Sequence, residues 1–145
     1  MSDLSLKVQR ALFAKSNVAA LVGAGKLSAI FESKAANTAT IPYGIITRQA
    51  SGPIERAFGP TRVLETDLYL LKVVADAGVS TSISPQAFAD DMLVTWEATI
   101  GGALLLTGGS SVVWCERFSD MPPFEEPRGD GWIYHRGILL RIVSR

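Results

Sequence analysis

The single histidine of the chain, His135, is the residue best suited to acid–base or metal chemistry, because imidazole ordinarily titrates near neutral pH. It lies in the closing segment GWIYHRGILLRIVSR, between Tyr134 and Arg136. The adjacent guanidinium disfavours a protonated imidazole, and the chain has no second histidine to help it bind a metal. We therefore expect a structural or interface role for His135. Catalysis would require it to lie in a cleft.

Other side chains with catalytic potential do not occur in the patterns that catalysis requires. No serine lies in a Gly-x-Ser-x-Gly motif. Asp90 and Asp91 are expected on a helix, where adjacent side chains point about 100° apart and do not easily share one site. Glu125 and Glu126 are expected in a flexible loop. Both carboxylate pairs are interpreted as solvated surface rather than as an acid–base site.

The segment GAGKLS at residues 23–28 is similar to a phosphate-binding loop, but it lacks two required features. Position 20 is alanine where the motif needs glycine, and Leu27 follows Lys26 where the motif needs serine or threonine. A helix C-terminus is the simpler interpretation. Cys115, the only cysteine, lies in an apolar run and is expected to be a buried, inert thiol in a reducing interior. The sequence therefore predicts no catalytic, cofactor or metal site.

Length and composition describe one ordinary globular domain spanning residues 1–145. Apolar residues make up 48% and charged residues 19%, and 14 basic side chains balance 14 acidic ones. A neutral chain has no overall electrostatic attraction to nucleic acid or to an anionic membrane. The N-terminus lacks the pattern of a signal peptide. The uncharged stretch 98–115 is broken by Gly and Ser pairs, which favour a helix end, a loop and a strand over a membrane helix.

The elements that must position these residues are predicted from hydrophobic periodicity. Helices are expected over 3–22, interrupted at Ser16-Asn17, and from Ser84 to about Ile100, with Ser84-Pro85 as a helix start. The second helix should bury Phe88, Met92, Leu93, Trp96 and Ile100. Strands are expected over 26–32, 41–48, 61–76, 110–118 and 132–145; loops over 33–40, 50–60, 78–84 and 120–131. This order predicts the α+β class, with an antiparallel sheet of four to five strands and two helices on one face.

The two long strands carry specific expectations. In 61–76, Leu64, Thr66, Leu68 and Leu70 alternate with Glu65, Asp67 and Tyr69. Residues 71–75 lose this alternation, which indicates a bulge or burial on both faces. In the last strand one face carries Trp132, Tyr134, Ile138, Leu140 and Ile142, and the other carries His135, Gly137 and Arg141.

Charged residues form two basic groups and one acidic group. The basic groups are Arg48, Arg56 and Arg62, and Arg136, Arg141 and Arg145; the acidic group is Asp120, Glu125, Glu126 and Asp130, against Arg128. The basic groups could contact phosphates, but an acidic protein surface is at least as good a partner. An acidic loop and a basic strand on one chain are complementary, which favours head-to-tail assembly. With His135, these side chains are the predicted interface.

Over nearly its whole length, the chain resembles the tail-completion, or tail-terminator, proteins of double-stranded-DNA phages and related particles. The segments that carry the resemblance are ALFAKSNVAALVGAG, IPYGIITRQAS, VLETDLYLLKVVAD, SPQAFADDMLVTWEATI and GWIYHRGILLRIVSR. The resemblance implies a non-enzymatic virion protein, without cofactors, that is assembled in the host cytoplasm. It implies a homo-oligomeric ring, a hexamer, at the head-proximal end of the tail. Its partners would be further copies of itself, the tail tube protein and the head–tail connector.

Such a ring stops tube polymerisation and joins the tail to the head, and DNA could pass through it without specific recognition. Two alternatives remain open on the sequence alone. One is a small non-enzymatic adaptor or regulatory domain, and the other is a different neck or minor tail component.

Overall fold

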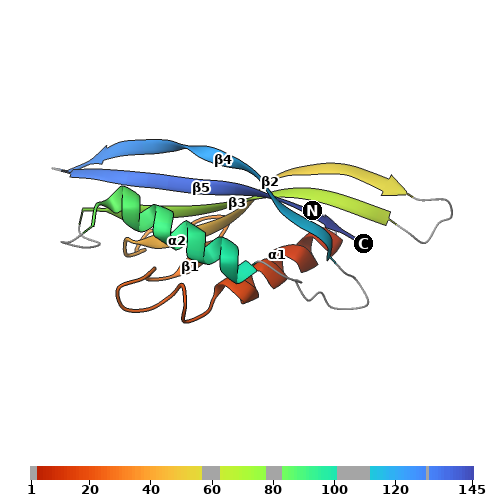
Figure 1. Cartoon of the computed structure of the whole chain (residues 1–145), viewed down its shortest axis with the longest axis horizontal. Helices are drawn as coiled ribbons and strands as arrows, with labels where there is room; N and C mark the ends of the chain where they lie inside the picture. The colour runs from red at the N-terminus through yellow and green to blue at the C-terminus, as the bar shows by residue number, and fades with distance from the viewer. Residues whose placement is uncertain (1–2, 57–62, 78–82, 101–111, 130) are drawn as a thin grey trace.

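The computed structural model describes residues 3–56, 63–77, 83–100, 112–129 and 131–145. Within these ranges the chain forms two helices and five strands (Figure 1). In order, they are α1 (Asp3–Ser16), β1 (Ile30–Glu32), β2 (Tyr43–Arg56), β3 (Val63–Asp76), α2 (Pro85–Ile100), β4 (Val112–Arg128) and β5 (Gly131–Ser144). The predicted α+β class is confirmed. Neither described helix is long and apolar enough to span a membrane.

The described strands form one sheet in the order β1-β2-β3-β5-β4. All neighbours pair antiparallel except β1, which runs parallel to β2. The expectation of a wholly antiparallel sheet is wrong at this one edge, because residues 33–42 form a connection longer than a hairpin turn. The two helices lie on one side of the sheet (Figure 1), with α1 against β1, β2 and β3 and α2 against β3 and β5.

Helix α2 begins and packs as its sequence predicts. The Ser84 hydroxyl accepts a hydrogen bond from the Ala87 amide at 3.1 Å, and Pro85 occupies the first helical position, where no amide proton is needed. The buried side chains are Phe88, Ala89, Met92, Leu93, Trp96 and Ile100. The glycine-rich segment predicted to follow, residues 101–111, lies outside the described residues.

The central strand β3 buries the face that carries its polar side chains. Asp67 and Tyr69 are buried on the helix side, in line with Leu71, Val73 and Ala75. The opposite face, with Leu68 and Leu70, is half-buried. β3 pairs with β5 without a register shift, and Val74 is buried as well. The lost alternation at 71–75 therefore reflects burial on both faces and not a bulge.

The closing strand β5 presents its predicted apolar face to the core only in part. Ile138, Leu140 and Ile142 are buried in the main hydrophobic cluster. Trp132, however, lies at the start of the strand and is 52% exposed, and Tyr134 is half-buried. The apolar alternation therefore extends beyond the part of the strand that the helices cover.

Two segments predicted as loops are strands. β2 continues to Arg56, so only residues 57–60 of the predicted loop 50–60 fall outside it, and these are not described. β4 continues to Arg128 through Pro122, Pro123 and Pro127. Proline is tolerated there because β4 is an edge strand, and the register shift between Met121 and Phe124 accommodates the proline pair. The two long hairpins point to opposite ends of the molecule (Figure 1).

The N-terminal region contains one helix rather than two. α1 ends at Ser16, whose hydroxyl donates to the Leu12 carbonyl at 2.6 Å. The second helix expected through Val22 is replaced by turns, and Gly25 adopts a positive φ of 74° before the chain enters β1. β1 itself spans only Ile30–Glu32 of the predicted 26–32. The short strand leaves most of the outer edge of β2 without a partner among the described strands.

Replacing Gly137 with alanine should destabilise the fold by about 1–3 kcal/mol, a typical cost of overpacking. A Cβ at this position would lie 2.9 Å from Leu70 Cδ1 and 3.0 Å from the Leu71 carbonyl oxygen. The carbonyl belongs to the central strand and cannot move away easily. Urea denaturation would measure the effect. Gly131→Ala is the control, because a Cβ there meets only the Arg128 carbonyl at 4.0 Å; equal losses in both variants would contradict the close strand contact.

Candidate functional site

His135 lies on the face of the sheet opposite the two described helices, where β5 pairs with β4. It is 9% exposed, and its Nε2 lies 2.8 Å from Glu126 Oε1. Phe124 is its cross-strand partner, with ring centroids 5.1 Å apart. Its Nδ1 is buried without a hydrogen-bond partner. His135 therefore connects the two strands of the hairpin, in agreement with the structural role expected from its sequence context.

A shallow pocket surrounds this contact. It has a volume of about 480 Å³ and is lined by Lys72, Met121, Pro122, Pro123, Phe124, Glu126 and His135. None of these lining residues is a serine, threonine or cysteine, so the pocket offers no hydroxyl or thiol nucleophile. Across the described part of the chain, no group of three or more His, Cys, Asp or Glu side chains could hold a metal ion. The pocket has mainly apolar walls, and its polar groups are the Lys72 ammonium, the Glu126 carboxylate and the His135 imidazole.

Two members of the predicted charged groups, Arg141 and Asp120, form ion pairs within the chain, each with a residue outside those groups. Glu116 on β4 binds Arg141 on β5, and the Arg141 guanidinium lies 5.6 Å from the centre of the Phe118 ring. Asp120 pairs with Arg117 at 2.7 Å. These contacts follow from the β4–β5 pairing, which places the acidic segment directly beside the basic strand. Arg141 and Asp120 are therefore already paired inside each copy, and the predicted contact between the acidic and basic groups of different copies stays a prediction.

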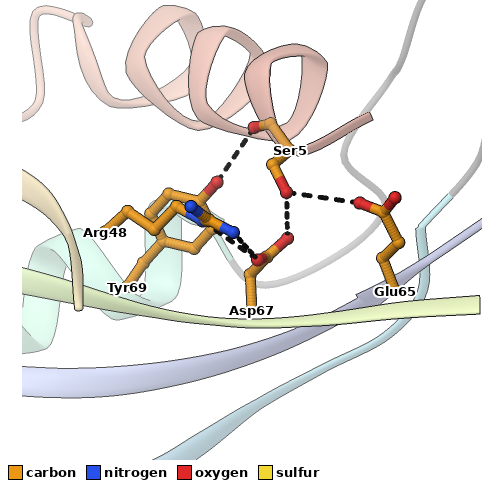
Figure 2. Close-up of polar contacts among 5 residues, drawn as sticks. All are labelled: Ser5, Arg48, Glu65, Asp67 and Tyr69. Atoms are coloured by element: carbon orange, nitrogen blue, oxygen red, sulfur yellow. Dashed lines mark hydrogen bonds and ion pairs between the residues drawn. The ribbon is translucent and has the colours of Figure 1, made fainter. Parts of the chain in front are cut away.

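Beneath the N-terminal half of α1, a polar cluster connects the helix to the sheet (Figure 2). Arg48 on β2 donates from Nε and Nη2 to Asp67 Oδ1, both at 3.0 Å. The Ser5 hydroxyl donates to Asp67 Oδ2 at 2.8 Å and lies 3.3 Å from Glu65 Oε2. The Tyr69 hydroxyl donates to the Ser5 carbonyl at 2.9 Å. Arg48, predicted as an interface residue, is thus placed in an internal ion pair with a carboxylate that is 1% exposed.

Two pKa shifts follow from burial in this half of the molecule. Burial, reinforced by the Asp67 and Glu65 carboxylates and opposed by Arg48, raises the pKa of Tyr69 well above its usual range. The phenol therefore stays protonated and keeps its donor role. Burial also raises the pKa of the Cys115 thiol. Cys115 is half-buried against the core, and a raised pKa agrees with the inert thiol expected there.

The remaining predicted interface residues are spread over several places. Glu125 and Arg128 are exposed near the tip of the β4–β5 hairpin. Arg136 lies on the helix side of β5 and reaches Asp90 of α2 at 3.4 Å. Arg56 ends β2, and the structure does not describe its side chain; Arg62 lies outside the described residues. The fold thus brings the hairpin residues together but keeps Arg48 apart from them.

Three residues of the pocket and of the exposed helix surfaces could hardly have been identified from the sequence. Lys72 lines the pocket, and its only signal is that it is the one charge in the apolar run 70–75. Val94, which is 67% exposed, stands among acidic residues on α2. Arg10 is exposed on α1. The helical periodicity that predicts the buried stripe of α2 also predicts an opposite, solvent-facing stripe, but it does not say what that stripe meets.

No protein-family model matches the chain, and no curated protein matches it. Among solved structures, the chain is similar to one in the structure described as "Virion of native gene transfer agent (GTA) particle". The two chains share 12% sequence identity with a TM-score of 0.67, and the similarity covers 99% of this chain and 98% of the other. At this level of identity, the likeness shows a common fold, and that fold extends over both chains almost completely.

Proposed function

We propose that this chain is a structural subunit of the tail of a phage or phage-like particle. In this proposal it forms a homo-oligomeric ring that ends the tail tube and joins it to the head connector. The observation that carries the proposal is the shared fold, over 99% of the chain, with a protein of a gene transfer agent virion. The tail-terminator pattern read from the sequence supports the same role. The imidazole of His135 is already hydrogen-bonded to Glu126, which supports a non-enzymatic role for the chain.

The sheet has two different open edges, which is what a ring requires. β4 is one edge strand, and beyond the three residues paired with β1, β2 has an outer edge as well. Two unlike edges favour head-to-tail contacts, and such contacts close into a ring when the rotation between copies permits it. The prolines at 122, 123 and 127 discourage strand addition along the outer half of β4. Contacts between copies would then use its first half, near 112–121.

The hairpin tips are suited to contacts above and below such a ring. The β4–β5 hairpin carries the exposed Glu125 and Arg128, and Trp132 and Phe124 are more than half exposed near its tip. Exposed aromatic and arginine side chains are enriched in protein interfaces. We assign this hairpin to the tube or connector contact, and we keep Arg56 and Arg62 as contact residues expected from the sequence alone.

Deleting the gene should give tail tubes of uncontrolled length that are not joined to heads, because nothing would stop the polymerisation. Electron microscopy of lysates would show this, and complementation with the intact gene should restore normal particles. Complementation with His135→Gln, which keeps a hydrogen-bonding side chain beside Glu126, should also restore them. Failure of a soluble His135→Gln protein would favour an enzyme that needs the imidazole.

Particle association separates the proposal from an adaptor or regulatory domain. The protein should co-sediment with purified particles and bind isolated tail tube or connector protein. A protein that stays monomeric at all concentrations and binds neither component would contradict the tail role.

A further inference from the structure

The two helices carry opposite charge on the same side of the molecule. α1 contains Lys7, Arg10 and Lys15 against one acidic residue, Asp3. α2 contains Asp90, Asp91 and Glu97 and no basic residue. The whole chain is neutral, so this separation is a local feature of the helical layer. Both helices pack on one face of the sheet (Figure 1), so this layer combines a helix with a basic excess and an acidic helix.

The helices also lie toward opposite edges of the sheet. α1 contacts β1, β2 and β3, whereas α2 contacts β3 and β5. Given the strand order, the basic helix lies toward the β1 edge and the acidic helix toward the β4 edge. Copies placed side by side in one orientation would therefore bring the α1 side of one copy toward the α2 side of the next.

The exposed surface of α2 permits a close approach. Its solvent-facing residues include Ala87, Asp91, Val94 and Ala98, which follow one another at helical spacing. Val94 is 67% exposed, and Asp91 and Ala98 are its short neighbours along this stripe. A valine exposed to this degree beside short side chains is a surface against which another helix can pack. On α1, Arg10 and Ala14 form the corresponding exposed pair, four residues apart.

The central charges of these two surfaces have no partner inside the described chain. Asp90 reaches Arg136 at 3.4 Å and Glu97 reaches Arg117 at 3.7 Å, but the side-chain carboxylate of Asp91 forms no hydrogen bond or ion pair with another described residue. The same holds for Arg10 among the described residues. In contrast, the hairpin acids Glu116, Asp120 and Glu126 each have a partner in the same chain.

We propose that the exposed face of α2, centred on Asp91 and Val94, binds the exposed face of α1, centred on Arg10, of a second copy of this chain. The proposal rests on the ring proposed above and names the contact that joins its copies. Since the two faces differ, the contact is heterologous and repeats from copy to copy until the ring closes. Opposite charges select this pairing over α1–α1 or α2–α2 contacts, which would bring like charges together.

Charge reversal tests the contact. Arg10→Glu and Asp91→Lys should each raise the dissociation constant for self-association at least about tenfold at low salt, and the effect should shrink at high salt because exposed charges are screened. The Arg10→Glu, Asp91→Lys double variant should return to within about threefold of the original chain. Glu125→Lys, on the hairpin, makes the same charge change as Asp91→Lys and should leave self-association unchanged. Sedimentation velocity measures all four variants.

Cross-linking tests the direction of the contact. In a Cys115→Ala background, Arg10→Cys combined with Asp91→Cys should give a ladder that extends beyond the dimer when treated with a bis-maleimide. Either cysteine alone should remain essentially unlinked, and efficient dimers from one of them would show a two-fold contact and contradict the proposal. Oligomers that form normally in each of the two single charge-reversal variants would overturn this interface and leave the tail role intact. A chain that stays monomeric and binds neither tube nor connector would overturn both.

Discussion

Replacing Trp96 with alanine is expected to lower the free energy of unfolding by about 3–5 kcal/mol, the usual range for removing a buried tryptophan. Trp96 is fully buried in the cluster that joins both helices to the sheet. An added Cβ on Gly44 of β2 would lie only 2.9 Å from Trp96 Cζ3, so the indole packs directly on the strand backbone. Its removal would leave a cavity that glycine cannot fill. Urea denaturation with linear extrapolation would measure the loss.

Trp96→Phe is the matched control for the polar part of this contact. The indole Nε1 donates to Ser16 Oγ at 2.8 Å, and Ser16 itself donates to the Leu12 carbonyl. Phenylalanine retains most of the buried ring but loses the donor. The serine hydroxyl keeps its bond to Leu12, so the loss should be clearly smaller than for alanine. A Trp96→Ala loss below about 1 kcal/mol would contradict the packing of α2 against both α1 and the sheet.

Replacing Asp67 with alanine is expected to cost about 3–5 kcal/mol, because it removes one partner of a buried ion pair and leaves the other charge uncompensated. Asp67 is 1% exposed and holds the Arg48 guanidinium through two hydrogen bonds. The same carboxylate accepts from Ser5 of α1, so the substitution also weakens the attachment of the first helix (Figure 2). Urea denaturation gives the magnitude.

A double-mutant cycle identifies the cause of the loss. Arg48→Met combined with Asp67→Leu replaces both charges with apolar groups of similar size, which is often neutral or stabilising for a buried pair. The double variant should therefore be more stable than either Asp67→Ala or Asp67→Leu alone. Additive losses from the two sites would mean that Arg48 and Asp67 contribute independently, contrary to the geometry of the cluster.

In the Asp67→Ala variant, loss of the contacts between α1 and the sheet would appear as faster amide exchange in residues 5–16.

These two clusters explain how the chain holds its two described helices on one face of the sheet. Trp96 and Ser16 connect α2 to α1, while Asp67, Tyr69 and Ser5 connect α1 to β3. Both contacts leave the outer surfaces of the helices uncovered. A rigid helical layer with open outer surfaces is what the proposed contact between copies requires, since little ordering would oppose association.

The amino-acid sequence by itself determined the elements whose signals are local. Ser84-Pro85 and the spacing of Phe88, Met92 and Trp96 specify α2, because capping and helical periodicity act within a few residues. The long strand from Val63 to Asp76 was equally predictable from its alternating pattern. So was the position of His135 opposite the core face, since strand alternation has a strict period of two.

Only the tertiary structure decided where strand pairing produces a structure that the local composition does not indicate. The proline-rich segment 120–128 has the composition of a loop, yet it forms half of a hairpin because β5 supplies hydrogen-bond partners along its length. The same pairing joins Glu126 to His135 and Glu116 to Arg141. Asp67 of β3 can be buried because Arg48 of β2 and Ser5 of α1 both donate hydrogen bonds to its carboxylate. These outcomes depend on residues distant in sequence, and the free energy of a buried charge or a proline-containing strand is set by those partners and not by its neighbours.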